Sequence, residues 1–518
     1  MKRLIKAVAA VFAVTSVFAF AEDFTVLQGK EDGVVDGEYY LGTAYENVTW
    51  GRLPNKDSKP VIKIPSGATI TIDTLSHEGL LEDQGKDPVK YFKSKGVPEN
   101  QILKVGSEIT SSDKPHDFDG DGPHIVTGPV YVEGAEPGDV LKVEVLSLYP
   151  RVPYGVITNR HFKGVLVGEF PENEGRLPGA DKDHPERYNN ISIFTPIRKA
   201  GDGKWEAYLV ENGHEITFPC FPFLGIMGVA NATDEKLSSI PPTRLGGNLD
   251  INELGLGSTL YLPVDVEGAL FFTGDPHFVQ GDGEVALTAL EGSLRGTLRL
   301  TVLKKGSSQI PGNANNFDMC FAETEDYWIP IGLNQDLDEA MKQSVRESID
   351  FLNEQLGIDR KVAYAYLSGA TDYEVSQAVD KTKGIHALIQ KRDFAKFIEV
   401  KAGAKEQTLP VVVQRDGFYT EATALFKAIG ASASVKKGVA TVTLNGKKYV
   451  MTAESNKYLA DGTKLTLTKS PFIDGGKFYV PTAVVLDILG LPLNWSKRLW
   501  DLSKLISIRL LPNCSVPV

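Results

Sequence analysis

The segment Val140–Leu148, VLKVEVLSL, alternates apolar and polar side chains. Because successive side chains of a β-strand point to opposite faces, this pattern predicts a strand with one buried face. Val61–Ile72 (VIKIPSGATITI) alternates in the same way around a Pro-Ser-Gly turn and predicts a hairpin, and Leu260–Val266, Ala269–Phe272 and Leu294–Leu303 are further strand-like runs. The density of such runs up to about residue 308 predicts a mainly β fold, a β-sandwich or distorted barrel rather than a βαβ architecture.

A helical pattern follows at Asp336, which has Glu339 three residues on, as in a capping box. Apolar residues then recur at helical spacing, and Gly357 is placed to end the helix. The residues of this stripe are Met341, Val345, Ile349, Leu352 and Leu356. The stretch from here to about Gln390 mixes helix and strand signals, so we expect an α+β element in it.

The N-terminus has the pattern of a secretory signal peptide. Lys2, Arg3 and Lys6 precede an apolar run, Ala7–Phe20, that is short for a membrane span, and cleavage is expected after Ala21. We therefore expect a secreted or cell-surface-associated protein. The formal net charge of -12 argues against nucleic acid and anionic lipid as partners.

Three cysteines, Cys220, Cys320 and Cys514, are spread over almost three hundred residues. This spacing is not that of a disulfide framework, so buried free thiols are expected, with one disulfide at most. Cys220 lies in the apolar segment FPCFPF, which is typical of a structural thiol rather than a nucleophile. The chain also has no G-x-S-x-G elbow of the kind that presents a catalytic serine.

The segment GDPHFVQGDGE, residues 274–284, concentrates the polar chemistry. Asp275 and His277 are two residues apart, as are Asp282 and Glu284, so each pair projects to one face of an extended chain. A histidine beside carboxylates and flexible glycines can bind a metal ion or transfer protons. The alternative is an exposed acidic loop without chemistry.

Two other polar clusters contain histidines. SHEGLLEDQG, residues 76–85, places His77 and Glu78 after a predicted strand, and HDFDGDGPH, residues 116–124, ends at His124. The second cluster begins like an EF-hand, but that motif needs a glutamate at its twelfth position, where this chain has Gly128. An EF-hand is therefore excluded, while a calcium ion in an irregular loop stays an alternative.

Several long segments together resemble the acetamidase/formamidase family. They are HIVTGPVYVEGAEPGDVLKVEVL, the SHEG and DQG elements, FPFLGIMGVA, GGNLDINELGLGSTLYLPV, GALFFTGDPHFVQGDGEVALTALE and AYLSGATDYEVSQAVD, in family order between about residues 65 and 380. The resemblance implies hydrolysis of a small amide such as formamide or acetamide to carboxylate and ammonia. It also implies association with a divalent metal, zinc first, and a homo-oligomer, while calcium stays the alternative from the irregular loop.

The resemblance also suggests which residues act in such a site. The expected metal ligands are His77, His124, Asp275 and His277, because three protein ligands and one open position suffice to activate a water. Glu284 or Asp282 is expected to act as base and then as acid toward the leaving ammonia. Asn248 and backbone N–H groups near Gly246 and Gly247 are candidates to hold the oxyanion, and Gln280, Gly247 and Asp250 are expected to contact substrate.

Beyond residue 409 a different module begins. Gly417-Phe418-Tyr419 and Gly476–Pro481 each precede a predicted helix, and these two halves resemble the stalk domain that is also called copper amine oxidase N-terminal-like, whose name does not imply copper. Such α+β domains are common on secreted proteins of Gram-positive bacteria, so the resemblance implies cell-wall or surface association. The final residues, LISIRLLPNCSVPV, are expected to be irregular.

The predicted organisation is a signal peptide (1–21), a catalytic region (22–390), a Lys- and Ala-rich linker (391–408) and the stalk domain (409–518). A different class of function stays open, in which an exported protein has lost catalysis and serves as a surface binding or assembly protein on an amidase scaffold. The intact GDPHFVQGDGE segment favours the enzyme, because a scaffold has no need of it.

Overall fold

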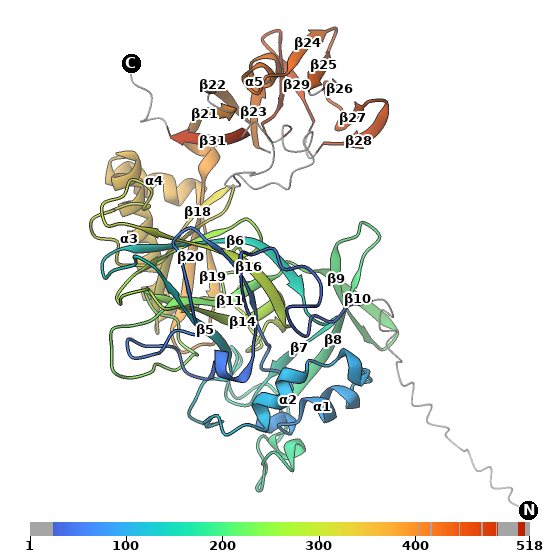
Figure 1. Cartoon of the computed structure of the whole chain (residues 1–518), viewed down its shortest axis with the longest axis vertical. Helices are drawn as coiled ribbons and strands as arrows, with labels where there is room; N and C mark the ends of the chain where they lie inside the picture. The colour runs from blue at the N-terminus through green and yellow to red at the C-terminus, as the bar shows by residue number, and fades with distance from the viewer. Residues whose placement is uncertain are drawn as a thin grey trace, which may run out of the picture.

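The structure is a computed structural model that describes residues 24–402, 405–414, 417–444, 446–467, 470–482, 484 and 506–512. The predicted signal peptide lies outside the described residues. Two large sheets and a C-terminal module make up the chain (Figure 1). This confirms the prediction of a mainly β fold with a small α+β domain at the C-terminus.

The first sheet has nine strands. In spatial order they are β1 (Tyr39–Leu41), β4 (Thr69–Asp73), β16 (Leu294–Leu303), β6 (Val140–Pro150), β13 (Thr259–Pro263), β17 (Phe321–Glu323), β18 (Tyr327–Asn334), β20 (Lys383–Gln390) and β19 (Asp372–Gln377). The segment VLKVEVLSL thus lies in β6, where β16 and β13 pair with it antiparallel on its two sides.

The second sheet has eleven strands. Its main path is β10 (His214–Pro219), β9 (Trp205–Glu211), β8 (Ile191–Lys199), β7 (Tyr154–Asn159), β15 (Leu290–Glu291), β14 (Phe271–Val279), β11 (Phe223–Val229) and β12 (Gly246–Asn248). β5 (Ile125–Val132) pairs with β14 and also with the short strands β2 (Val48–Trp50) and β3 (Ile62–Ile64). The central strands of this sheet, β14 and β11, are almost wholly buried.

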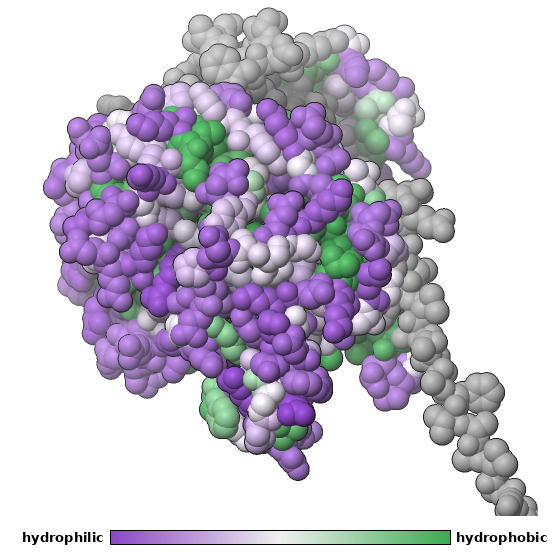
Figure 2. Space-filling view, turned by 60° about the horizontal axis from the view of Figure 1, so that its bottom comes forward, coloured by the Kyte–Doolittle hydropathy of each residue, from purple (hydrophilic) through white to green (hydrophobic). Residues whose placement is uncertain are grey.

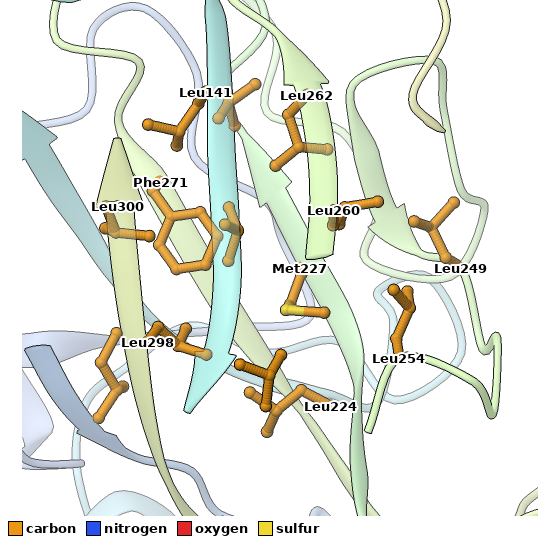
Figure 3. Packing of buried hydrophobic residues seen from close by; sticks show 14 of the residues in the cluster. Leu141, Leu224, Met227, Leu249, Leu254, Leu260, Leu262, Phe271, Leu298 and Leu300 are labelled. Atoms are coloured by element: carbon orange, nitrogen blue, oxygen red, sulfur yellow. The ribbon is translucent and has the colours of Figure 1, made fainter. Parts of the chain in front are cut away.

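A large apolar core lies between the two sheets. Leu141, Leu262 and Leu300 come from the first sheet, and Met227 and Phe271 come from the second (Figure 3). All five are nearly inaccessible to water. The polar residues considered below therefore occupy positions on strands whose neighbouring residues are fixed by this core.

The predicted hairpin at Val61–Ile72 is wrong. Its first half, β3, pairs with β5 in the second sheet, while its second half, β4, pairs with β1 and β16 in the first sheet. The Pro-Ser-Gly turn therefore carries the chain from one sheet to the other, with Gly67 at φ +87°. Both Ile64 and Ile70 enter the shared core, so the same alternation serves two sheets instead of one pair.

Two helices, α3 (Leu337–Leu356) and α4 (Arg360–Ala370), pack beside the first sheet. The predicted cap and end of α3 are confirmed, because the Asp336 carboxylate accepts hydrogen bonds from the N–H groups of Asp338 and Glu339 and Gly357 is left-handed. The reciprocal half of the capping box is absent, since the N–H of Asp336 donates to Asn334 instead.

The predicted apolar stripe of α3 is confirmed in its second half and wrong in its first. Leu352 and Leu356 are buried, whereas Met341 is exposed and the buried residues of the first half are Ala340, Ser344 and Ser348. Gly332 on β18 explains the difference, because a Cβ at that position would meet the backbone of Ala340 and Ser344. Small residues let this half of the helix approach the strand closely.

Asp336→Ala is expected to lower the free energy of unfolding by about 1 kcal/mol, because it removes the acceptor for two N–H groups at the start of α3. Urea unfolding of the two proteins measures the loss. Asp338→Ala is the matched control, since it removes an exposed first-turn carboxylate that does not cap the helix. An equal loss in the control would contradict the role of Asp336.

The remaining helical elements of the body are short. They are α1 (Pro88–Ser94), α2 (Lys104–Thr110) and the 3-10 turns Tyr45–Asn47, Glu82–Gln84, Glu99–Gln101, Pro185–Tyr188 and Lys391–Asp393. In Figure 1, α1 and α2 lie at the end of the molecule opposite the C-terminal module. Within the described residues, no helix has the length and apolar character needed to cross a bilayer. Figure 2 shows that hydrophilic residues cover most of the α1–α2 end.

The C-terminal module has its own apolar core, separate from that of the body. A six-stranded sheet runs β29 (Phe472–Asp474), β30 (Lys477–Pro481), β23 (Gly417–Glu421), β22 (Lys405–Gln414), β21 (Ala395–Ala402) and β31 (Ile506–Pro512). A five-stranded meander follows as β24 (Ser432–Lys436), β25 (Val439–Leu444), β26 (Lys447–Thr452), β27 (Lys457–Ala460) and β28 (Thr463–Thr466), and α5 (Ala422–Ala428) packs between them.

Two sequence expectations about this module differ from the structure. The stretch interpreted as a linker, 391–408, contains β21 and the first residues of β22. The tail expected to be irregular contains β31, which pairs with β21 along its whole length. β21 forms a hairpin with β22, which follows it directly, and its other side pairs with β31 about a hundred residues later. Its Lys- and Ala-rich composition does not indicate either pairing.

Candidate functional site

Four buried side chains meet around Asp275. His77 follows β4, His124 immediately precedes β5, and Asp275 and His277 both belong to β14. Oδ1 of Asp275 lies 3.9 Å from Nδ1 of His77 and 3.6 Å from Nε2 of His124, and its Oδ2 lies 3.1 Å from Nε2 of His277. The structure therefore brings together the four residues that the sequence suggests as metal ligands.

The four do not form one compact group. Ligand atoms of His77, His124 and Asp275 all lie within 4.8 Å of one another, whereas His277 is grouped in the same way with Asp250 and Asp275. Nδ1 of His124 is hydrogen-bonded to Oγ of Ser239 at 2.8 Å, so its Nε2 is left to face Asp275. A second partner of this kind commonly orients a metal-binding imidazole.

Several polar atoms in this cluster are buried without a hydrogen bond. They include both ring nitrogens of His77, both ring nitrogens of His277 and Oδ1 of Asp275. Buried polar groups in native proteins nearly always have a partner, so an unsatisfied set of nitrogen and oxygen atoms at one point indicates a missing ligand. The donor types, imidazole nitrogen and carboxylate oxygen, are those that zinc binds.

The backbone at the site is held in an uncommon conformation. Asp275, Asp250 and Glu284 all have left-handed backbone angles, with φ of +48°, +50° and +47°. Such angles are rare outside glycine and cluster at functional sites. Gly225 on β11 lies against them, because a Cβ there would overlap Oδ1 of Asp250 and come within 2.8 Å of Oδ2 of Asp275.

A group of three buried carboxyl side chains adjoins the histidines. Asp250, Glu284 and Asp380 place oxygens within 4.8 Å of one another. Burial raises the pKa of all three, to about 7 for Asp380, and the charge of Asp380 raises the pKa of Asp250 and of Glu284 further. Carboxyl groups packed in this way share protons at neutral pH, which suits the transfer of a proton to or from a ligand.

Asp380 was not among the predicted site residues. It lies between β19 and β20 and accepts a hydrogen bond of 2.8 Å from Nδ2 of Asn248. Glu291 was missed as well, and its Oε1 lies 3.1 Å from Nε2 of His277, with a pKa that burial raises to about 7. Each is the last residue of a segment already singled out in the sequence, AYLSGATDYEVSQAVD and GALFFTGDPHFVQGDGEVALTALE.

Glu78 supports His77 from behind. Its Oε1 lies 3.3 Å from Nε2 of His77 and 3.0 Å from Nη2 of Arg160, whose Nε in turn pairs with Asp83 at 2.7 Å. Burial alone would raise the pKa of Glu78, but Arg160 and His77 hold that pKa at about 2. Gln84 also donates to Glu78 and accepts from the N–H of Gly79, so the SHEGLLEDQG cluster is a buried network and not a polar loop.

The predicted substrate contacts have defined hydrogen-bonding states. Nε2 of Gln280 donates to the carbonyl groups of Asp250 and Ser376, both at 2.9 Å, which leaves Oε1 of Gln280 without a partner. Oδ1 of Asn248 is also buried and unpartnered. The N–H of Gly246 donates to the carbonyl of Thr243, so this group is not free to hold an oxyanion, and Gly247 lies beside it, opposite Met227 in the β11–β12 pair.

Asp282 does not join Asp275. It accepts a hydrogen bond from Nδ2 of Asn252 at 3.1 Å and faces His386, Glu253 and Glu374, on the other side of Gly283 from Glu284. Apart from His124, no residue of the loop 116–124 belongs to a possible metal-binding group within the described part of the chain. There Asp121 pairs with Arg52 at 2.6 Å, so the calcium site considered for this loop has no support.

Neither Cys220 nor Cys320 has the properties of a nucleophile. Burial raises the pKa of both Cys220 and Cys320 to about 12, and both are free thiols. A thiol with such a pKa has almost no thiolate at neutral pH, so the prediction of structural thiols is confirmed for these two residues. Cys514 lies outside the described residues.

Comparison with known proteins gives two family matches. A model of the Acetamidase/Formamidase family matches residues 101–234 and 224–390, and a model of the copper amine oxidase N-terminal domain matches residues 400–503. The acetamidase of Mycolicibacterium smegmatis is 28% identical over 200 residues, 31% of this chain and 49% of that protein. The formamidase of Methylophilus methylotrophus is 29% identical over 217 residues, 35% of this chain and 52% of that protein.

The chain spans about half to two thirds of the length of the curated relatives that it matches. Among solved structures, the acetamidase of Bacillus halodurans superposes with a TM-score of 0.51 at 26% identity and covers 68% of this chain and 98% of its own. The similarity therefore includes nearly the whole of that structure and leaves the C-terminal module outside it.

Proposed function

Because the chain belongs to the acetamidase/formamidase family, we propose that it hydrolyses the carbon–nitrogen bond of a small linear amide to a carboxylate and ammonia. The observation that carries this proposal is the contact between two groups. His77, His124 and Asp275 present unsatisfied nitrogen and oxygen atoms, and the proton-sharing carboxyl groups of Asp250, Glu284 and Asp380 lie beside them through the shared residues Asp250 and Asp275.

We propose that a divalent metal ion, zinc in the first place, is held by His77, His124 and Asp275, with His277 next to them. The fit rests on the buried atoms without hydrogen bonds and on the nitrogen and oxygen donors that zinc prefers. Calcium fits less well, because it is bound by six to eight oxygen ligands. When bound, such an ion supplies Lewis-acid activation of water and of the amide carbonyl.

Glu284 is proposed to move the protons. Its carboxyl group is fully buried and lies with His277 and Glu291 on one side and with Asp250 and Asp380 on the other. It therefore reaches the point where water is deprotonated and can return the proton to the leaving nitrogen, which a small amide expels poorly without protonation. Asp282 faces away from this point, so we assign the base to Glu284 alone.

The unsatisfied acceptors favour a substrate with N–H groups. Oε1 of Gln280 and Oδ1 of Asn248 are buried and have no hydrogen-bond donor. A primary amide brings two N–H donors to the leaving nitrogen, and leaving such acceptors unpaired is costly. Nδ2 of Asn248 donates one of its hydrogens to Asp380, and its second hydrogen can be donated to the developing oxyanion.

We further propose that the protein acts outside the cytoplasm, as an oligomer of identical chains, and is retained at the surface of a Gram-positive cell through the C-terminal module. The support is the N-terminal pattern of a secretory signal and the module's separate apolar core.

The full chain is expected to release ammonia from formamide or acetamide, to lose that activity after treatment with a chelator, and to regain it with Zn²⁺. A coupled ammonia assay over a panel of short amides measures this. Full activity after exhaustive metal removal would overturn the role of the metal, and release of no ammonia from any amide by metal-loaded protein would overturn the amidase.

A further inference from the structure

A second group of ionisable side chains lies across Gly283 from Glu284. It comprises Glu253 in the turn after β12, Asp282, Glu374 on β19 and His386 on β20, and we refer to it as the His386 cluster. Nε2 of His386 lies 3.1 Å from Oε2 of Glu253 and 3.7 Å from Oε2 of Glu374. None of these four residues belongs to the site described above.

The histidine is oriented as a ligand would be. His386 is fully buried, and its Nδ1 is hydrogen-bonded to Oγ of Ser376 at 2.8 Å. Its Nε2 therefore points at the carboxylates, yet neither this nitrogen nor Oε2 of Glu253 makes a hydrogen bond of normal geometry. An imidazole held from behind, with its other nitrogen bare among carboxylates, is the usual arrangement of a metal-binding histidine.

Acidic side chains outnumber basic ones in the cluster. Glu253, Asp282 and Glu374 bring three carboxyl groups against the single imidazole of His386. A divalent cation bound among them would offset this excess of acidic groups.

We propose that the His386 cluster binds a divalent transition-metal ion, with Nε2 of His386 and the carboxylates of Glu253 and Glu374 as ligands and Asp282 beside them. Ligand atoms of the first three lie within 4.8 Å of one another, and the mixture of one imidazole and several carboxylates suits Zn²⁺.

The ion would fix the loop that carries Glu284. The N–H of Gly283 donates to the carbonyl of Ser376 at 3.3 Å, and the N–H of Ala378 donates to the carbonyl of Gly283 at 3.1 Å. Asp282 is thus tied to the His386 cluster while Glu284, two residues on, enters the first site. A metal ion at the His386 cluster would therefore position Glu284. This consequence rests on the proposed function, but the binding of the ion itself does not.

Equilibrium dialysis of the metal-free full chain against saturating Zn²⁺, followed by elemental analysis, tests the proposal. Glu253→Gln/Glu374→Gln is the informative variant, because both residues are partly exposed and the change keeps their shape. Glu133→Gln/Glu169→Gln, at two exposed positions outside both sites, is the matched control. The wild type and the control are expected to bind two zinc ions per chain and the informative variant one.

Equal zinc content in the wild type and the Glu253→Gln/Glu374→Gln variant would overturn the proposal and leave His386 as a charge-paired histidine. If the wild type binds one ion and this variant none, the His386 cluster is the metal site. The proposed metal site at His77, His124 and Asp275 would then be contradicted. Hydrogen exchange gives a second readout. Zn²⁺ is expected to slow exchange of the Gly283 N–H in the wild type and not in the variant, and an equal effect in both would contradict the positioning of the loop.

Discussion

Glu284→Gln is expected to lower the turnover of a small amide by about 10²- to 10⁴-fold, the usual loss when a proton-transfer group is removed. The fold should tolerate the change. Glutamine keeps the size and shape of the buried side chain, and because burial and Asp380 already raise the pKa of Glu284, the fold does not depend on a charge at this position. Ammonia release and a thermal melt of the same preparation separate the two effects.

Glu133→Gln provides the control for this comparison, since the same chemical change at an exposed position should alter neither quantity. Asp282→Gln is not an equivalent control, because Asp282 belongs to the His386 cluster. Turnover of Glu284→Gln within a few-fold of the wild type would remove Glu284 from the chemistry and return GDPHFVQGDGE to a structural segment.

Asp73→Ala is expected to reduce the free energy of unfolding by about 3–5 kcal/mol, because it removes the only carboxylate described between two fully buried arginines. Asp73 accepts hydrogen bonds from Nε and Nη2 of Arg295, at 2.6 and 3.0 Å, and from the hydroxyl of Tyr40 at 2.6 Å. Arg151 lies 3.7 Å away, so the substitution leaves two guanidinium groups buried without their counter-charge.

Urea unfolding of the full chain measures this loss. Asp57→Ala removes an exposed aspartate and should change stability by no more than about 0.5 kcal/mol. A loss for Asp73→Ala near that of the control would mean that the buried arginines find other acceptors, and the ion pair would then be marginal for the fold.

The sequence predicts an element well where its structure depends on residues that are close together in the chain. The strand-like run predicted at Leu294–Leu303 has the same bounds as β16, and the cap at Asp336 depends only on the next three residues. It predicts the arrangement of strands poorly where their pairing depends on a segment far away in the chain. β31, about a hundred residues away, pairs with one side of β21, and β3 and β4 lie in different sheets because they pair with different strands.

The same distinction applies to the site. His77, His124 and Asp275 are far apart in the chain and meet only through the sheets, so the sequence could suggest their residue types but not their contacts. Asp282 and Glu284 look equivalent in GDPHFVQGDGE, yet the chain between them is pinned to β19 and sends them to different clusters. Asp380 was missed because the residues next to it in the sequence do not indicate that Asn248 donates a hydrogen bond to it.

The junction between the two bodies of the chain has a mechanical consequence. β20, which carries His386, passes into β21 of the C-terminal module through only four residues, the turn Lys391–Asp393 and Phe394. Lys391 is held in place, since its N–H donates to the carbonyl of Asp326 and its ammonium to the side chain of Glu323. Tension applied to an anchored module would therefore reach β20, the strand next to the edge of the first sheet, without a long flexible segment to absorb it.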